Sequence, residues 1–238
     1  MKLNTNSNVY TVVYAAIVVV IVAFLLAFVS TALKSKSDAN VENDTKKQIL
    51  ASLGQRNVAD ADVQATWDKY IVADLVVDTT GNIVKEGKEK DQDGFRINRK
   101  DIKPENNALP VFVANVDGQT KYVLPLIGKG LWGPIWGYIA VDADGQTVFG
   151  AYFDHESETA GLGAEIKATY FQDQFKGKKL ETADGSATLT VVKNGKVDKP
   201  EIQADGISGA TLTGNGVAAM LSEGISMYQP YLHKLNQQ

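Results

Sequence analysis

The sequence predicts an α+β fold, an antiparallel, hairpin-rich sheet with flanking helices, preceded by one transmembrane helix. Three features of the chain support this prediction. It opens with a long uncharged apolar segment, continues with short apolar runs separated by Asp-Gly and Asn-Gly pairs, and closes with apolar residues at helical spacing. A block of strands bounded by helices, without regular alternation of the two, is typical of this class.

The first element is a predicted membrane anchor at residues 1–34. No charged residue lies between Leu3 and Leu33, and Val12–Val29 is almost wholly apolar. A hydrocarbon core of about 30 Å needs about 20 helical residues, which this segment supplies. The alternative is a cleaved signal peptide, whose apolar region is usually only about 7–15 residues. The flanking positive charges are nearly balanced, so they do not decide which side the remainder faces.

The anchor is followed by a polar segment and then by two predicted helices. Residues 35–44 are rich in Ser, Asp, Asn and Lys and predict a short linker, after which 45–238 form the domain. A helix is expected at 44–54, with its cap at Asp44 or Thr45 and its end at Gly54. A second helical stretch is expected at 60–71.

The middle of the chain predicts a series of strands. Residues 85–108 interrupt it and are charged enough to predict a solvated loop. Turn pairs between apolar runs predict four hairpins, at Gly81-Asn82, Asp117-Gly118, Asp144-Gly145 and Asn194-Gly195. An amphipathic helix that packs on the sheet is expected near the end, with its apolar positions at Val217, Leu221, Ile225, Tyr228, Leu232 and Leu235.

The composition excludes several kinds of chemistry. The chain has 238 residues, no cysteine, and only two histidines, His155 and His233, far apart in sequence. Disulfides, thiolate nucleophiles and cysteine-ligated metals are therefore excluded, and redox chemistry would have to come from an organic cofactor. Residues 1–36 carry only basic charges, so the remainder is more acidic than the chain's formal net charge of −4. This balance argues against nucleic acid as a partner.

Two glycine-rich segments resemble dinucleotide loops only superficially. Gly128–Gly133 reads GKGLWG and follows a strand, but Pro134 and another apparent strand come next instead of a helix, so a Rossmann site is rejected. The glycines are better explained by a tight corner beside Trp132. Gly214–Ala219 opens a helix, yet no strand leads directly into it.

Two further segments combine glycine with hydroxyl and acidic residues. Asp205–Thr213, DGISGATLT, precedes a helix expected near Thr211, and the unpaired N–H groups of such a helix start attract anions such as phosphate. Ser208 is a candidate cap, so an ordinary capped helix is the alternative. His155–Ile166, HESETAGLGAEI, either brings the backbone close to a flat ligand or is a flexible loop.

These segments resemble the motifs of the FMN-binding domain family. Asp205–Thr211 is similar to the flavinylation motif of that family, and His155–Gly163 is similar to its second signature, with Ala160 where proline is usual. GKGLWGPIWGYIAV looks like the Gly-Leu-Trp segment of the same proteins. The resemblance covers nearly the whole chain.

The resemblance implies a covalent flavin. Thr211 would be joined to FMN by a phosphoester bond, formed by a separate flavin transferase. The remaining implied cofactor-binding residues fall in the same three segments and comprise Asp205, Ser208, Gly209 and Ala210 of the flavinylation motif, Glu158, Thr159, Gly161 and Leu162 of the second signature, and Trp132. It implies no catalytic or metal-binding residue in this chain.

The resemblance also implies a function and a location. The chain would be a single-pass protein of the bacterial inner membrane with its flavin domain on the extracytoplasmic side. It would relay electrons from NADH toward quinone within a Na⁺-translocating NADH:quinone reductase, with Na⁺ export coupled to the reaction. A G-type flavin electron carrier of an RNF complex and a cofactor-free, membrane-tethered binding domain are the alternatives.

Overall fold

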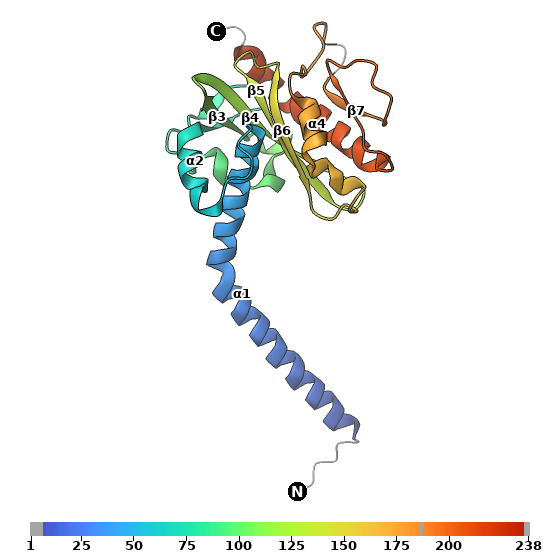
Figure 1. Cartoon of the computed structure of the whole chain (residues 1–238). Helices are drawn as coiled ribbons and strands as arrows, with labels where there is room; N and C mark the ends of the chain where they lie inside the picture. Colours follow the sequence, from blue (N-terminus) through green and yellow to red (C-terminus); the bar gives the residue numbers. More distant parts are fainter. Residues whose placement is uncertain (1–6, 186–187, 236–238) are drawn as a thin grey trace. The chain divides into compact units, whose positions relative to one another are not determined.

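The computed structural model of this protein describes residues 7–185 and 188–235 (Figure 1). The chain divides into two compact units, Met1–Thr45 and Lys46–Gln238. The first six residues of the predicted anchor and the last three of the chain lie outside the described residues.

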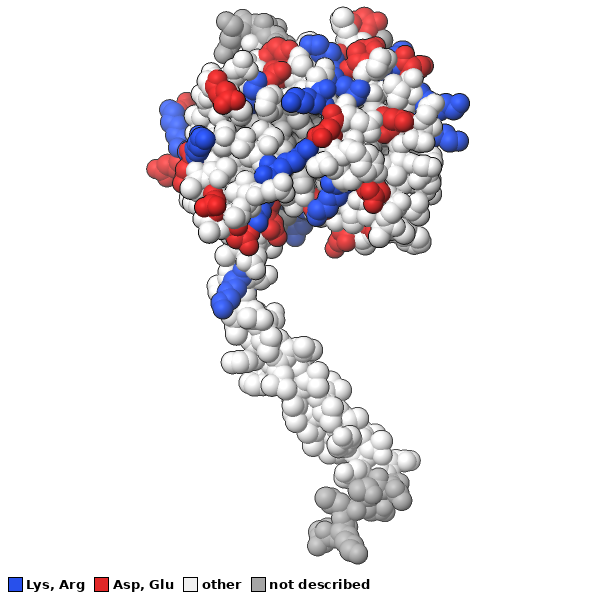
Figure 2. All heavy atoms as spheres, viewed as in Figure 1, with Lys and Arg blue, Asp and Glu red and all other residues white. Residues whose placement is uncertain are grey.

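Helix α1 (Asn8–Ser52) contains the apolar segment. Its most apolar window has a mean hydropathy of 3.2 with none of it buried, and it is the one helix in the described residues long and apolar enough to cross a membrane. Figure 2 shows no charged side chain along this stretch. The polar segment 35–44 is helical, so the helix start predicted at Asp44 or Thr45 was wrong. The reason is that α1 contains no glycine or proline to interrupt the helix.

The second unit is built on a six-stranded antiparallel sheet, which confirms the predicted fold class. The strand order is β2-β1-β3-β4-β5-β6. Three of the four predicted turn pairs connect neighbouring strands, and at one of them Asp117 and Gly118 have φ of 52° and 80°, as a two-residue hairpin turn requires. The strands are β1 (Ile71–Val77), β2 (Ile83–Lys85), β3 (Leu109–Val116), β4 (Gln119–Lys129), β5 (Pro134–Asp142) and β6 (Val148–His155).

Each face of the sheet carries its own hydrophobic core. Alternate side chains of β4 show the division, because Leu124 and Leu126 belong to one core whereas Val123 belongs to the other. Helix α4 (Thr211–Leu235) packs in the first core, and all six of its predicted apolar positions contact it. The second core joins the last turns of α1 to α2 (Val63–Tyr70), which is preceded by the 3₁₀ turn η1 (Asp60–Asp62) (Figure 1).

The charged segment 85–108 is folded onto the sheet and is not simply a solvated loop. It forms three 3₁₀ turns, η2 (Gly94–Arg96), η3 (Arg99–Asp101) and η4 (Pro104–Asn106). The buried Asp74 carboxylate on β1 accepts the N–H groups of Asp93 and Phe95, both at 3.0 Å. Gly87 packs so closely that a Cβ there would lie 2.2 Å from the Asp74 carbonyl oxygen.

Between β6 and α4 the chain forms short elements and a second sheet. The short elements are η5 (Gly163–Lys167), α3 (Thr169–Gln172) and η6 (Asp173–Phe175). The hairpin predicted at Asn194-Gly195 was wrong, because β7 (Thr190–Val192) pairs in parallel with β8 (Gln203–Asp205). A parallel pair needs a crossover between its strands, and residues 196–202 provide it.

Candidate functional site

Three segments that stand out in the sequence meet around one hollow. The segments are the corner at 130–133 between β4 and β5, the loop after β6, and the start of α4. The hollow has a volume of about 140 Å³, and we call it the first hollow. It is lined by Leu131, Glu158, Thr159, Leu162, Gly163, Gly209, Ala210, Thr211, Leu212 and Thr213.

The corner between β4 and β5 is a tight turn, as expected. The Gly130 N–H donates to the Gly133 carbonyl at 2.8 Å. The backbone N–H of Trp132 donates to Glu158 Oε1 at 2.9 Å, but the Trp132 indole is 66% exposed and does not line the hollow. Leu131 lines it instead. The predicted segment is therefore present at the hollow, with a different side chain facing it.

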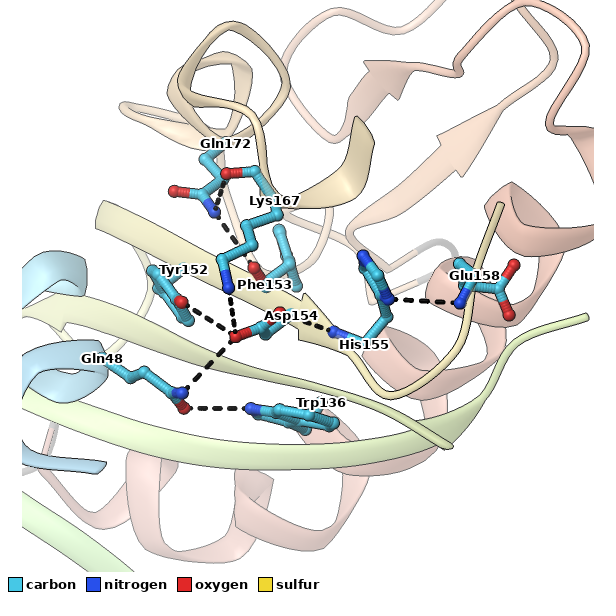
Figure 3. Close-up of polar contacts among 9 residues, drawn as sticks. All are labelled: Gln48, Trp136, Tyr152, Phe153, Asp154, His155, Glu158, Lys167 and Gln172. Atoms are coloured by element: carbon cyan, nitrogen blue, oxygen red, sulfur yellow. Dashed lines mark hydrogen bonds and ion pairs between the residues drawn. The ribbon is translucent and has the colours of Figure 1, made fainter. Parts of the chain in front are cut away.

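Glu158 holds the three segments together. Its carboxylate is buried, with Oε1 on the Trp132 N–H and Oε2 accepting the Thr213 hydroxyl at 2.6 Å. Its own N–H donates to His155 Nδ1 at 3.2 Å (Figure 3). A Cβ on Gly163 would lie 2.4 Å from Glu158 Oε2, so any larger residue there would displace this carboxylate. These bonds offset the cost of burying the charge.

The loop 156–162 turns back at Gly161. This glycine has a φ of +73°, which disfavours any residue with a side chain, and nothing lies within 4 Å of its missing Cβ. The N–H groups of Leu162 and Ala164 both donate to the Thr159 carbonyl at 3.1 Å. The half-exposed Leu162 side chain approaches Gly209, whose Cβ would lie 2.9 Å from it. Gly161 thus shapes the loop, while Thr159, Leu162 and Gly163 face the hollow.

Helix α4 begins at the hollow with unpaired donors. Within the described residues, no acceptor takes the N–H groups of Thr211, Leu212 and Thr213, and the first bonded amide is that of Gly214, which donates to the Ala210 carbonyl at 2.9 Å. The expected cap is absent, because the exposed Ser208 hydroxyl bonds to none of the described residues. The helix start therefore presents three free donors.

The two threonines of the motif have opposite environments. Thr213 is 2% exposed and its hydroxyl is bonded to Glu158. Thr211 is exposed, and its hydroxyl has no partner among the described residues. Thr211 also borders a second, smaller hollow on the other side of the helix start. That second hollow is lined by Val191, Val192, Lys193, Asn194, Gly206, Ile207, Ala210, Thr211, Gly214 and Asn215.

Asp205 lines neither hollow. Its carboxylate accepts the Gly195 N–H at 2.6 Å and the Asn194 side chain at 3.3 Å, which fastens the turn after β7 to the end of β8. That turn places Lys193 at the second hollow, where its ammonium has no ion pair in the described residues. Asp205 therefore holds the turn that borders the second hollow.

Sequence reasoning missed several residues of the two hollows. No sequence pattern distinguishes the missed residues from ordinary loop or helix residues. They are Leu131, Gly163 and Leu212 at the first hollow, and Lys193 and Asn215 at the second. The burial of Thr213 could have been predicted, because it lies four residues before the buried Val217 and so continues the apolar stripe of α4. Within the described residues, no group of three or more His, Asp or Glu side chains is placed to hold a metal ion.

Residues 130–226 match the family model of the FMN-binding domain. The NqrC subunit of the Na(+)-translocating NADH-quinone reductase of Haemophilus ducreyi is 36% identical across 221 residues, covering 85% of this chain and 84% of that protein. The chain belongs to the NqrC family of Na(+)-translocating NADH-quinone reductase subunits. The NqrC of Vibrio alginolyticus is 35% identical, with 79% of this chain and 80% of that protein covered.

Solved structures of the NqrC family agree with this fold. The crystal structure of the NqrC from Parabacteroides distasonis is 40% identical, with a TM-score of 0.77, and covers 84% of this chain and 96% of its own. The Shewanella oneidensis NqrC structure is 25% identical, with a TM-score of 0.67, and covers 83% and 98%. The predicted family is confirmed in preference to an RNF-type carrier, and the FMN-binding match contains all three segments of the site.

Proposed function

We propose that this chain carries a covalent FMN on Thr211 and relays electrons within a Na⁺-translocating NADH-quinone reductase. The observation that carries the proposal is an open threonine hydroxyl beside three free helix N–H groups. Such a helix start stabilises a phosphate through its N–H groups and its positive dipole end. The membership of the NqrC family and the FMN-binding match support the choice of ligand.

The residues of the site fit the parts of an FMN. The donors of Thr211, Leu212 and Thr213 suit the phosphate, and the apolar side chains of Leu131 and Leu162 suit a flat ring. The bound flavin would supply the one-electron chemistry. The protein residues would orient it and keep water from one side of the ring.

The proposed attachment of FMN to Thr211 is a phosphoryl transfer from FAD. The Thr211 oxygen forms a bond to the phosphorus of the FMN half, the pyrophosphate bond breaks, AMP leaves, and the hydroxyl proton is lost. The described surroundings of Thr211 contain no side chain bonded to this hydroxyl, so we assign the activating base to the flavin transferase.

We further propose the arrangement of the whole protein. Residues 1–34 anchor it in the inner membrane by a single span, and 45–238 form an extracytoplasmic flavin domain. The other subunits of the complex would be its partners, with the NADH, quinone and sodium sites mainly on them. The apolar, unburied window of α1 supports the anchor.

Intact mass measurement tests the attachment. After co-expression with the flavin transferase, the wild type should gain the mass of one FMN less one water, and Thr211→Ala should gain nothing while still folding, because an exposed hydroxyl is removed. Thr213→Ala is the matched control and should keep the adduct, although it loses a buried bond to Glu158. An adduct on Thr211→Ala, or none on the wild type, would refute the proposal, and the second result would favour a cofactor-free binding domain.

A further inference from the structure

A second buried carboxylate lies at the base of the loop that carries Glu158. Asp154, at the end of β6, is 6% exposed. Its Oδ1 accepts the His155 N–H at 2.9 Å, and its Oδ2 accepts the Tyr152 hydroxyl and the Lys167 ammonium, both at 3.0 Å (Figure 3). We call Gln48, Tyr152, Asp154, His155 and Lys167 the Asp154 cluster.

Two members of the Asp154 cluster mark the two ends of the Glu158 segment. His155 opens the segment and Lys167 ends η5, so the two carboxylate oxygens each hold one end. Gln172 connects the same two parts of the chain, because its side-chain amide donates to the carbonyls of Phe153 at 3.1 Å and Lys167 at 3.0 Å. Side-chain hydrogen bonds from Asp154 and Gln172 therefore connect the two ends of the Glu158 segment.

The other side of Asp154 faces the last turns of α1. Gln48 Nε2 lies 3.5 Å from Asp154 Oδ2, and Gln48 Oε1 accepts the Trp136 indole N–H at 3.0 Å. The bond from Trp136 fixes the orientation of the amide, so its NH₂ group points to the carboxylate (Figure 3). The Arg99 guanidinium stacks on the Trp136 ring at 4.1 Å. Asp154 is thus linked to helix α1 and strand β5 as well as to the loop.

We propose that Asp154 is a positioning residue for the flavin site, which sets the place of Glu158 by holding both ends of residues 155–167. Glu158 is three residues from His155 and bonds to its ring, so a shift of the His155 backbone moves the donor and acceptor groups at the first hollow. The part of this inference that concerns flavin rests on the proposed function. The part that concerns the order of the segment does not.

Hydrogen exchange of the full chain in detergent tests the loop. Asp154→Asn keeps the size of the side chain but removes the charge that pairs with Lys167. Loss of this charge-assisted bond should make the Leu162 and Ala164 amides exchange roughly tenfold faster. Amides in the β3–β4 ladder should be unchanged. Asp173→Asn is the control, because it removes an exposed carboxylate that pairs with Arg56 at 2.7 Å outside the cluster.

The covalent flavin gives a second measurement. At equal adduct mass, Asp154→Asn should shift the flavin absorption spectrum and midpoint potential relative to wild type and Asp173→Asn. Lys167→Met should repeat both effects, and Lys167→Arg should restore them, since Arg keeps a cation at this position. Lys167 is exposed enough that its variants keep the fold if Asp154→Asn does not.

The outcomes separate the two proposals. Loop exchange in Asp154→Asn or Lys167→Met that equals the wild-type rate, or that rises equally throughout the sheet, would overturn the positioning role. A changed loop with an unchanged flavin spectrum and potential would overturn its effect on the site. Absence of the adduct from the wild type would instead refute the proposed function, and the exchange data would still decide the role of Asp154.

Discussion

Glu158 and Gly163 illustrate how single residues define this site. A carboxylate can be buried only where donors reach it, and Glu158 finds a backbone N–H on one oxygen and the Thr213 hydroxyl on the other. Both donors come from segments distant in the chain. Its length and charge suit it to link the corner at Trp132 to helix α4, and the absent side chain of Gly163 leaves the space for that link.

Gly163→Ala should therefore weaken the link. The added Cβ would lie 2.4 Å from Glu158 Oε2 and 2.5 Å from the Thr213 hydroxyl oxygen, so one of them must move. We expect a loss of about 1–3 kcal/mol in the free energy of unfolding, the usual cost of overpacking. Urea unfolding followed by tryptophan fluorescence measures it.

Gly214→Ala is the control for this variant. Its Cβ would meet only a Val191 methyl at 3.8 Å, an ordinary contact, and alanine favours a helix by about 1 kcal/mol relative to glycine. It should be neutral or stabilising. If Gly163→Ala proves as stable as wild type, the packing around Glu158 is looser than these distances require.

At the scale of elements, the sequence predicted what local patterns determine. The hairpin at Asp117-Gly118 was correct because turn chemistry and flanking strands are contiguous, and α4 was correct because its apolar stripe has helical spacing. The hairpin at Asn194-Gly195 was wrong because a turn sequence does not determine which strands pair. Residues 196–202 cross over, so β8 pairs with β7 in parallel. The same limit holds for the site. Its motifs could be found in the sequence, but the hydrogen bond between Thr213 and Glu158 joins residues far apart in the chain and became visible only in the fold.

The segment 85–108 is the other element that was predicted incorrectly from the sequence. Its hydrogen bonds to the Asp74 carboxylate predict that the stability of the fold depends on pH. Burial raises the pKa of the Asp74 carboxyl above 3.8, the N–H groups of Phe95 and Asp93 lower it, and the charges of Asp93 and Asp91 raise it again. Because the folded pKa exceeds the unfolded one, the contribution of this group to stability is complete below pH 3.8 and is lost as the pH rises through the folded pKa.

Asp74→Asn should remove that loss. The amide oxygen can still accept both N–H groups, so we expect the variant to gain stability relative to wild type as the pH rises from about 4 to 8. Urea unfolding across this range measures the difference. Asp117→Asn, which changes an exposed carboxylate in a turn, should run parallel to wild type. A constant difference between Asp74→Asn and wild type across the range would show that the carboxyl has the same pKa in both states.

At the scale of the whole molecule, the chain combines a long uncharged apolar segment of helix α1 with a folded unit whose surface mixes both signs of charge. Figure 2 shows lysine, arginine, aspartate and glutamate interspersed over the folded unit, without a large patch of one sign on the visible face. A surface of this kind suits a soluble environment. It gives no preference for one side of the membrane, as the nearly balanced charges around the span give none.

The proposed extracytoplasmic location is tested with spheroplasts. Protease added outside should digest the folded unit, including exposed sites such as the turn at Lys193, and leave a protected fragment that contains the apolar part of α1. A known periplasmic protein and a known cytoplasmic protein serve as the cut and uncut controls. Protection of the whole chain, while the periplasmic control is digested, would place the domain in the cytoplasm.

The start of helix α4 also has a consequence for selectivity between hydroxyl groups. Each residue of an α-helix advances by about 100°, so Thr211 and Thr213 project in nearly opposite directions, one toward solvent and one toward the carboxylate of Glu158. Asn215, four residues after Thr211, returns to the same phase and borders the second hollow with it. A modifying enzyme would then need no sequence discrimination between the two threonines, because the angular position on the folded helix already exposes one and hides the other. If Thr211 carries the flavin as proposed, the chain would fold first and be modified second.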